Sequence, residues 1–229
     1  MRLDEEYCLS EYVDLGRLGD NEKVHIVRNQ VNGVIGVRKY VALDLEEIYL
    51  FLKENPNAYI PKIYECIQTD TNLIVIEEYL SGKNLEEMLK EKYFSEKDAA
   101  DIIICLCNAL YPLHHAKMPV ICRDLKAENV ILTNEGEVKL VDFDIARIYQ
   151  PGKSKDTVMM GTQGYAAPEQ FGFGQTDART DIYAMGVLLN YMLVREFPME
   201  KLTEGKFRTI VLKCIKINPE DRYQNVDEL

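Results

Sequence analysis

The first third of the chain has the pattern of hydrophobic and polar positions that is typical of β-strands. Residues 23–28 (KVHIVR) and 34–39 (VIGVRK) are β-branched runs separated by a turn-like segment, which predicts a hairpin. Residues 60–68 and 72–78 have the same character and predict two more strands. We therefore expect this part of the chain to be built mainly from short strands.

Apolar residues recur at helical spacing once in the first third and in much of the chain after residue 84. Asn84 and Ser95 are suited to cap the helices that follow them. The predicted helices cover residues 44–53, 85–92, 96–115, 182–194 and 207–217. Residues 148–174 are rich in small and polar residues and lack periodicity. A loop of that length in a compact domain is usually functional or disordered.

The composition places the chain with globular proteins and excludes several classes. Its 229 residues, 47% of them hydrophobic, suffice for one large domain or two small ones. A formal charge of -11 repels nucleic acids and anionic membrane surfaces. No apolar run reaches the roughly 18 residues of a membrane span, and no signal peptide pattern is present, so we expect a cytoplasmic protein. The six cysteines form no zinc-binding spacing and are expected to be reduced.

Three short motifs carry most of the chemical information. Residues 122–129 (CRDLKAEN) are followed thirteen residues later by residues 142–144 (DFD), and then by residues 167–169 (APE). The first motif alone would also suit a polar turn between the apolar pairs 120–121 and 130–131. The occurrence of all three motifs in this order argues against the interpretation as a simple polar turn.

These residue types suit phosphoryl transfer. The reaction spreads negative charge over the oxygens of the transferred group, so its site needs metal ligands, a cation and an acceptor for the hydroxyl proton. Asp142 and Asn129 offer hard oxygen ligands, and Lys126 offers a cation. Asp124 offers a carboxylate five residues before Asn129.

The three motifs resemble the catalytic loop, metal-binding triplet and activation-segment end of the protein kinase family. The resemblance implies that Asp124 accepts the proton of a serine or threonine hydroxyl, that Lys126 offsets charge, and that Asn129 and Asp142 hold Mg²⁺, with Mn²⁺ possible. Lys126 is typical of the serine/threonine branch. Residues 161–186 are most similar to bacterial kinases of the eukaryotic-like type.

The resemblance extends over nearly the whole chain. It implies that residues 161–165 (GTQGY) shape the platform for a protein substrate and that Asp181 braces the backbone of the catalytic loop. It also implies that Arg222 pairs with Glu169. The residues after Val194 are few for this family, which normally has one more helix, so we expect either a compact variant or a truncated chain.

The implied fold is α+β and two-lobed. A small lobe of antiparallel strands with one helix would cover residues 1–79, and a larger, mainly helical lobe would cover residues 80–229. ATP would sit between the lobes, with Glu78 and Leu80 presenting backbone groups to adenine. The other implied ATP contacts are Leu18, Gly19, Val24, Val37 and Ile131.

The phosphate-binding lysine is expected on the strand 34–39. Lys39 and Arg38 lie on opposite faces because side chains alternate along a strand. We choose Lys39, which places Val37 on its face, and keep Arg38 as the alternative. Glu47 is the expected ion-pair partner from the helix 44–53, with Glu46 as the alternative.

Glu77 falls at a position that is usually apolar in this family. A buried carboxylate needs a partner or water, since an unpaired buried charge is expensive. Either Glu77 pairs with a cation such as Lys39, or the alignment of this strand is shifted by one residue.

Three departures from the family pattern stand out. Residues 15–24 (LGRLGDNEKV) lack the G-x-G-x-x-G spacing, which weakens the expected phosphate contacts. Cys122 replaces a histidine that mainly packs and hydrogen-bonds, a change that the chemistry should survive. Asp144 replaces the glycine of the metal-binding triplet, which should make that triplet less able to flip.

Regulation by phosphorylation is expected in the aperiodic stretch. Arg123 can pair in this family with a phosphorylated residue of the activation segment. Ser154 and Thr157 are the better candidates, because Thr162 is expected to hydrogen-bond to the catalytic loop. A simply solvated and mobile loop is the alternative.

Two rival functions remain open at this point. A pseudokinase scaffold would suit the altered phosphate loop but would not require all four residues Asp124, Lys126, Asn129 and Asp142. A small-molecule phosphotransferase would be expected to lack the platform at residues 161–169. The protein substrate, the regulatory input and the oligomeric state are not predicted.

Overall fold

The computed structural model describes residues 3–19, 21–152, 160–172 and 174–229, and the chain forms two compact units. Unit 1 is Met1–Ser81 and unit 2 is Gly82–Leu229. The division falls two residues after the boundary expected from the sequence.

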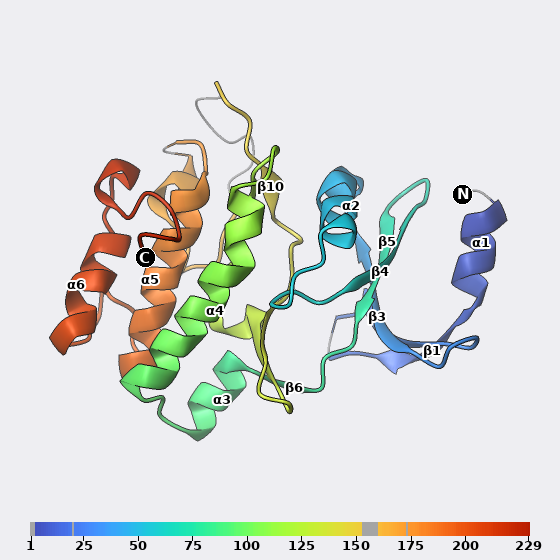
Figure 1. Cartoon of the computed structure of the whole chain (residues 1–229), viewed down its shortest axis with the longest axis horizontal. Helices are drawn as coiled ribbons and strands as arrows, with labels where there is room; N and C mark the ends of the chain where they lie inside the picture. Colours follow the sequence, from blue (N-terminus) through green and yellow to red (C-terminus); the bar gives the residue numbers. More distant parts are fainter. Residues whose placement is uncertain (1–2, 20, 153–159, 173) are drawn as a thin grey trace. The chain divides into compact units, whose positions relative to one another are not determined.

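Unit 1 is built on a five-stranded antiparallel sheet with the strand order β1-β2-β3-β5-β4 (Figure 1). The strands are β1 (Tyr12–Arg17), β2 (Val24–Asn29), β3 (Ile35–Val41), β4 (Ile63–Gln68) and β5 (Leu73–Glu78). Every residue of β5 except Glu78 is buried, as expected for a strand inside the sheet. The sequence predicted four of these strands but missed β1, which is mostly exposed.

Two α-helices accompany this sheet, where the sequence predicted one. Helix α1 (Leu3–Ser10) precedes β1, and α2 (Glu46–Glu54) contacts β4 after the short 3-10 turn η1 (Leu43–Leu45). In this segment the buried residues are Leu45, Ile48, Tyr49 and Leu52. These positions are three or four apart, so a single face of the helix packs against the sheet.

Unit 2 is mainly helical. Its helices are α3 (Leu85–Glu91), α4 (Glu96–His114), α5 (Ala178–Val194) and α6 (Gly205–Cys214). Asn84 and Ser95 form capping boxes at the starts of α3 and α4, as the sequence predicted. Helix α5 packs against both α4 and α6 and is buried on most of its surface, which makes it the centre of this unit.

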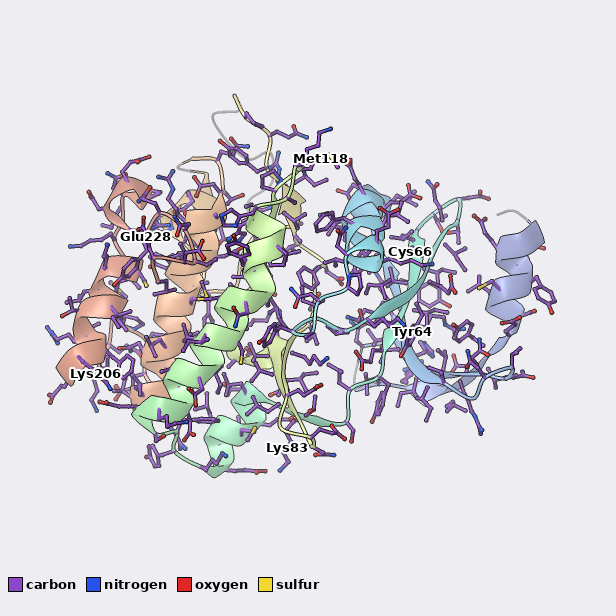
Figure 2. The ribbon with its side chains drawn as sticks, in the orientation of Figure 1. Tyr64, Cys66, Lys83, Met118, Lys206 and Glu228 are labelled. Atoms are coloured by element: carbon purple, nitrogen blue, oxygen red, sulfur yellow. The ribbon has the colours of Figure 1, made fainter. Side chains whose placement is uncertain are left out.

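Short strands and turns complete unit 2 and carry its polar motifs. β6 (Gly82–Asn84), β8 (Val130–Thr133) and β9 (Val138–Leu140) form one small sheet, and β7 (Val120–Ile121) pairs with β10 (Arg147–Ile148). The 3-10 turns of this unit are η2 (Ala127–Asn129), η3 (Pro168–Phe171) and η4 (Pro219–Asp221). Figure 2 draws the side chains of both units, with Tyr64 and Cys66 labelled on β4.

The observed architecture is the α+β fold expected from the sequence: a small antiparallel β unit and a larger helical unit. No helix within the described part of the chain is long and apolar enough to cross a membrane.

Candidate active site

The polar loop of residues 122–129 is held in unit 2 by apolar anchors on both sides. It leaves the buried strand β7 and enters β8 through the turn η2. Cys122, Leu125 and Ala127 within it are fully buried. These anchors fix the loop backbone, while the residues between them remain available for polar contacts. Burial also raises the pKa of the Cys122 thiol well above its usual value, which suits a packing role in place of histidine.

Asp181 in α5 holds the backbone of this loop in place, and we call this support the brace. Its carboxylate accepts hydrogen bonds from the backbone N–H groups of Cys122 (2.9 Å) and Arg123 (2.8 Å). Arg123 has a φ of 68°, a left-handed conformation that costs a non-glycine residue about 1–2 kcal/mol. The two bonds to a fully buried carboxylate therefore stabilise a strained backbone.

His114 is a further member of this brace that the sequence did not predict. Its Nε2 donates to Oδ2 of Asp181 at 2.8 Å, and its side chain is 3% exposed. His114 is the last residue of α4. Its partner lies 67 residues further along the chain, so no local pattern indicated the contact.

The carboxylate of Asp124 is surrounded by donors. Oδ1 accepts from the Thr162 hydroxyl at 2.7 Å, and Oδ2 lies 2.8 Å from the Lys126 ammonium and accepts from Asn129 Nδ2 at 3.0 Å. Lys126 also donates to the Thr162 hydroxyl at 3.1 Å. The side chain of Asp124 is 14% exposed. An oriented carboxylate of this kind, with limited access to water, is suited to accept a proton from a nearby hydroxyl.

Asn129 and Asp142 are brought together by a backbone contact. The N–H of Val141 donates to the carbonyl oxygen of Asn129 at 2.9 Å, which places the next residue, Asp142, beside the end of the catalytic loop. The Asn129 amide nitrogen is bound to Asp124, so the amide oxygen points the other way. One amide oxygen and one carboxylate are hard donors and fit a divalent cation such as Mg²⁺.

The triplet at residues 142–144 has an unusual backbone at its first position. Asp142 has a φ of 68°, whereas Asp144 is absent from the residues with positive φ. The N–H of Asp144 donates to Oδ1 of Asp142 at 3.1 Å. Aspartate in place of glycine at residue 144 therefore requires no left-handed backbone in this conformation.

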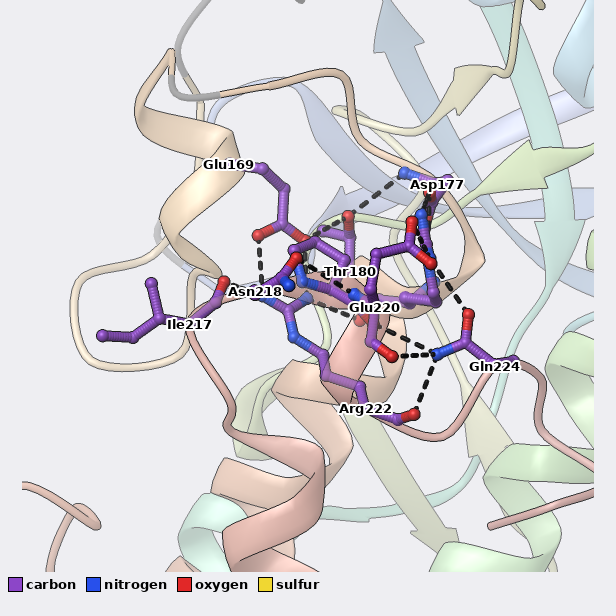
Figure 3. A network of polar contacts seen from close by, with 10 residues as sticks. Glu169, Asp177, Thr180, Ile217, Asn218, Glu220, Arg222 and Gln224 are labelled. Carbon is purple, nitrogen blue, oxygen red and sulfur yellow. Dashed lines mark hydrogen bonds and ion pairs between the residues drawn. The ribbon is translucent and has the colours of Figure 1, made fainter.

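Glu169 and Arg222 form the expected ion pair at the end of the activation segment (Figure 3). The two bonds measure 2.7 and 2.9 Å. Thr180 donates to the same glutamate at 2.9 Å, and Arg222 also donates to the carbonyl oxygen of Arg179. The turn η3 is thereby joined to α5 and to the last segment of unit 2.

Gln170 connects this turn to the catalytic loop, and the sequence gave no indication of it. Its amide nitrogen donates to the carbonyl oxygens of Arg123 (2.9 Å) and Met160 (2.8 Å). Nearby, the buried ring of Tyr165 packs edge-on against Tyr191 and Phe197, and burial raises the pKa of its hydroxyl. Tyr165, the last residue of the expected substrate platform, therefore packs within an aromatic cluster.

In unit 1 the two candidate cations of β3 lie on opposite faces of the sheet. Lys39 shares the buried face with Val37, and its ammonium lies 2.5 Å from Glu77 Oε1. Arg38 instead pairs with Asp14 at 2.5 Å. The sequence left two explanations for Glu77, a pair with Lys39 or a shift of the strand alignment by one residue. The structure shows the pair with Lys39.

The structure shows Lys39 beside Glu77, and the expected pair between Lys39 and Glu47 stays a prediction. Glu47 is exposed on α2, and Glu46 is half-buried. Leu50 on the same helix is also exposed, at 40%. The buried residues of α2 are Ile48, Tyr49 and Leu52, and Glu47 is not among them.

The altered phosphate loop forms the turn between β1 and β2. Leu18 is 38% exposed, and its N–H donates to the carbonyl oxygen of Val24 at 2.9 Å. Gly19 has a φ of 68°, a conformation that favours glycine. Glu22 forms an exposed ion pair with Arg17 at 3.1 Å, so one of the acidic residues of this loop has a cation beside it.

The remaining predicted nucleotide contacts are distributed over both units. Glu78 ends β5, and its N–H donates to the carbonyl oxygen of Lys62 at 2.8 Å. Leu80 is half-buried in unit 1, and Ile131 is half-buried in β8 of unit 2. The candidate phosphorylation sites Ser154 and Thr157 lie outside the described residues, whereas Thr162 makes the hydrogen bond to the catalytic loop that was expected of it.

Comparison with known proteins finds protein kinases among the relatives of this chain. A probable serine/threonine-protein kinase PknB of Corynebacterium glutamicum is 38% identical over 130 residues, which is 55% of this chain and 20% of that protein. A probable serine/threonine-protein kinase of Clostridium perfringens is 32% identical over 71% of this chain and 27% of its own length. Protein kinase C zeta type of Oryctolagus cuniculus is 29% identical over 89% of this chain and 37% of its own length.

The chain therefore spans well under half the length of these three relatives. The family described as the protein kinase domain matches residues 27–229, which is most of the chain. With this match and with the arrangement of Asp124, Asn129 and Asp142 in unit 2, the chain belongs to the protein kinase domain family.

Proposed function

We propose that this chain is an active serine/threonine protein kinase that uses ATP and a divalent metal ion, and that Asp124 is its catalytic base. The observation that carries the proposal is the set of three donors around one carboxylate: Thr162, Lys126 and Asn129. They orient Asp124 and place a cation next to it.

The proposed reaction is a direct transfer of the γ-phosphoryl group. The oxygen of a serine or threonine side chain forms a bond to the γ-phosphorus, and the bond between that phosphorus and the β,γ-bridging oxygen breaks, which releases ADP. Asp124 takes the proton of the attacking hydroxyl. Lys126 offsets negative charge on the transferred group, and Lys39 contacts the α and β phosphates.

Mg²⁺ is the expected metal, and Mn²⁺ is the alternative. Asn129 and Asp142 would hold it, and the ion would neutralise charge on the phosphates. The chain's own contribution is to hold Asn129 beside Asp124 through the Asn129 amide, and to hold the residue before Asp142 against Asn129 through the backbone bond from Val141.

A scaffold without turnover is the second candidate function. The altered loop at residues 15–24 favours it, because the loop lacks the glycine spacing that brings the backbone close to phosphates. The complete set of catalytic and metal-binding side chains in unit 2 favours turnover. The two functions therefore make opposite predictions for a phosphate-transfer assay.

The test is transfer of radiolabelled γ-phosphate from ATP to casein, with Mg²⁺ and Mn²⁺ compared. We expect metal-dependent transfer to serine or threonine that falls by about 10²- to 10⁴-fold in Asp124→Asn, the range for loss of a general base. Asp101→Asn is the matched control, since Asp101 is an exposed carboxylate of α4 paired with Lys97, and it should leave the rate unchanged. Transfer by the wild-type chain at the level of Asp124→Asn would support the scaffold.

A further inference from the structure

The sheet of unit 1 places Glu77 next to Lys39 without help from a helix. In the antiparallel pairing of β3 with β5, Val37 lies opposite Glu77 and Lys39 lies opposite Val75. Glu77 is therefore the diagonal neighbour of Lys39 on the same face of the sheet. Such diagonal neighbours lie about 7–8 Å apart, within the reach of two long side chains.

The contact between the two side chains is short and shielded from water. Lys39 Nζ lies 2.5 Å from Glu77 Oε1, and the side chains are 13% and 8% exposed. Val37 and Val75 on the same face are 4% and 0% exposed. Burying a carboxylate in such a place costs free energy unless a cation pairs with it. Removing one partner of a buried ion pair is therefore strongly destabilising, because the other charge is left buried and unpaired.

The buried residues of η1 and α2 carry no charge: they are Leu45, Ile48, Tyr49 and Leu52. Of the two candidate carboxylates of α2, Glu47 is exposed and Glu46 is half-buried. Glu46 borders a cavity of about 740 Å³ together with Cys66 and Gln68, and burial raises the pKa of the Cys66 thiol to about 11. This cavity is lined by residues of α1, η1, α2 and β4 and of the turn after β4, and neither Lys39 nor Glu77 lines it.

We propose that Glu77 is the residue that positions the Lys39 ammonium for the nucleotide, so that β5 supplies the counter-charge of this lysine in place of α2. The proposal rests on the proposed function, because it assigns a role within the same phosphate-binding step. It has a mechanical consequence: both residues belong to adjacent strands of one sheet, so the orientation of Lys39 does not depend on a movement of α2.

The test is a double-mutant cycle on the affinity for Mg-ATP, measured by calorimetry on the whole chain. The variants are Lys39→Met, Glu77→Gln and the double variant. We expect Glu77→Gln to weaken binding about tenfold in the wild-type background and by less than about twofold in the Lys39→Met background. A positioning residue acts through its lysine, so its effect disappears with the lysine.

Two matched controls separate this role from a general effect on the sheet. Glu65→Gln removes a carboxylate from the neighbouring strand β4, where it pairs with Lys53 at 2.9 Å. Arg38→Ala removes the cation on the opposite face of β3. Both should bind Mg-ATP within about twofold of the wild type. Glu77→Met, which leaves no polar group at this position, should weaken binding at least as much as Glu77→Gln and provides a second variant if the first one does not fold.

In the transfer assay, the same substitution should act mainly through the KM for ATP. Glu77→Gln should raise that KM about tenfold with a smaller change in kcat, because the lysine contacts the bound nucleotide before and during transfer. Unfolding in urea, monitored by circular dichroism, confirms that each variant is folded under the assay conditions.

Several outcomes would overturn the proposal. One is that Glu77→Gln lowers the affinity for Mg-ATP equally in the wild-type and Lys39→Met backgrounds, and another is that neither Glu77→Gln nor Glu77→Met lowers it. A third is a loss of affinity that depends on Lys39 and occurs in Glu47→Gln in place of Glu77→Gln, and a fourth is a wild-type chain that fails to bind Mg-ATP. The binding cycle does not require turnover. A chain that shows the coupling but transfers no phosphate would contradict the proposed catalysis and leave the role of Glu77 supported.

Discussion

Arg222 and Glu169 are 53 residues apart in the sequence and form a two-point ion pair inside unit 2. Nη1 and Nη2 of the arginine lie 2.7 and 2.9 Å from the two carboxylate oxygens. Their side chains are 0% and 6% exposed. The remaining donors of Arg222 are bound to backbone carbonyl oxygens, including those of Lys216 and Ile217. One side chain thus connects the turn η3 to the segment after α6.

Removing Arg222 should therefore destabilise unit 2 strongly. Arg222→Met leaves Glu169 buried without its guanidinium, and we expect a loss of about 3–5 kcal/mol in the free energy of unfolding. Urea denaturation followed by circular dichroism measures this loss. Lys97→Ala, which breaks an exposed pair with Asp101, is the control and should leave the midpoint unchanged. Equal midpoints for the two variants would contradict the importance of the buried pair.

Asp142→Asn should abolish metal-dependent phosphate transfer while the fold survives. The substitution removes the charge of the one carboxylate assigned to the metal and preserves the side-chain shape. The side chain is half-buried, and its Oδ1 accepts a hydrogen bond from the N–H of Asp144, a bond that an amide oxygen can also accept. Transfer to casein and the urea midpoint are both measured. Activity within about threefold of the wild type would refute the assignment of Asp142 as the metal ligand.

The hydroxyl of Thr162 should matter more than its methyl group. It donates to Asp124 at 2.7 Å and accepts from Lys126 at 3.1 Å, so it helps to orient both of these proposed catalytic residues. Thr162→Ala should lower kcat by about ten- to a hundredfold, as for loss of one charge-assisted hydrogen bond of about 1.5–3 kcal/mol. Thr162→Ser should retain most of the activity. Similar rates for the alanine and serine variants would show that the hydroxyl does not position Asp124.

Local patterns in the sequence predicted the elements whose signals are local. Capping residues such as Asn84 and Ser95 act within one turn of the chain, and the helices after them begin where they indicate. The strand β1 gave no clear signal because it lies at the edge of the sheet and most of it is exposed. An edge strand needs no alternating apolar pattern to pair on one side.

The catalytic loop was predicted from its motifs, whereas its supports were not. Contacts such as His114 with Asp181 and Gln170 with Arg123 join residues 67 and 47 positions apart, and they depend on tertiary packing alone. The helix partner expected for Lys39 depends on a similar detail. To choose Glu47 from the sequence, one must know which face of α2 packs against the sheet to within one residue. The apolar residues of that helix, among them the exposed Leu50, are compatible with either of two neighbouring faces.

His114 offers a test of how the brace beneath the catalytic loop works. Its Nε2 donates to Asp181, which in turn accepts the backbone N–H groups of Cys122 and Arg123. Without the imidazole, the buried carboxylate loses one of its donors and the strained backbone at Arg123 loses part of its support. His114→Ala should therefore increase local opening of the loop.

Hydrogen–deuterium exchange, read by mass spectrometry on peptides that contain residues 122 and 123, measures that opening. We expect exchange at these amides to be about ten- to a hundredfold faster in His114→Ala, which corresponds to a weakening of about 1–3 kcal/mol for loss of a buried hydrogen bond. His115→Ala is the matched control: His115 is the next residue, its side chain is 45% exposed, and it bonds to the carbonyl oxygen of Tyr111 in its own helix. The control should exchange like the wild type. Unchanged exchange in His114→Ala would mean that Asp181 holds the loop without the histidine, and equal acceleration in both variants would point to a general loosening of the end of α4.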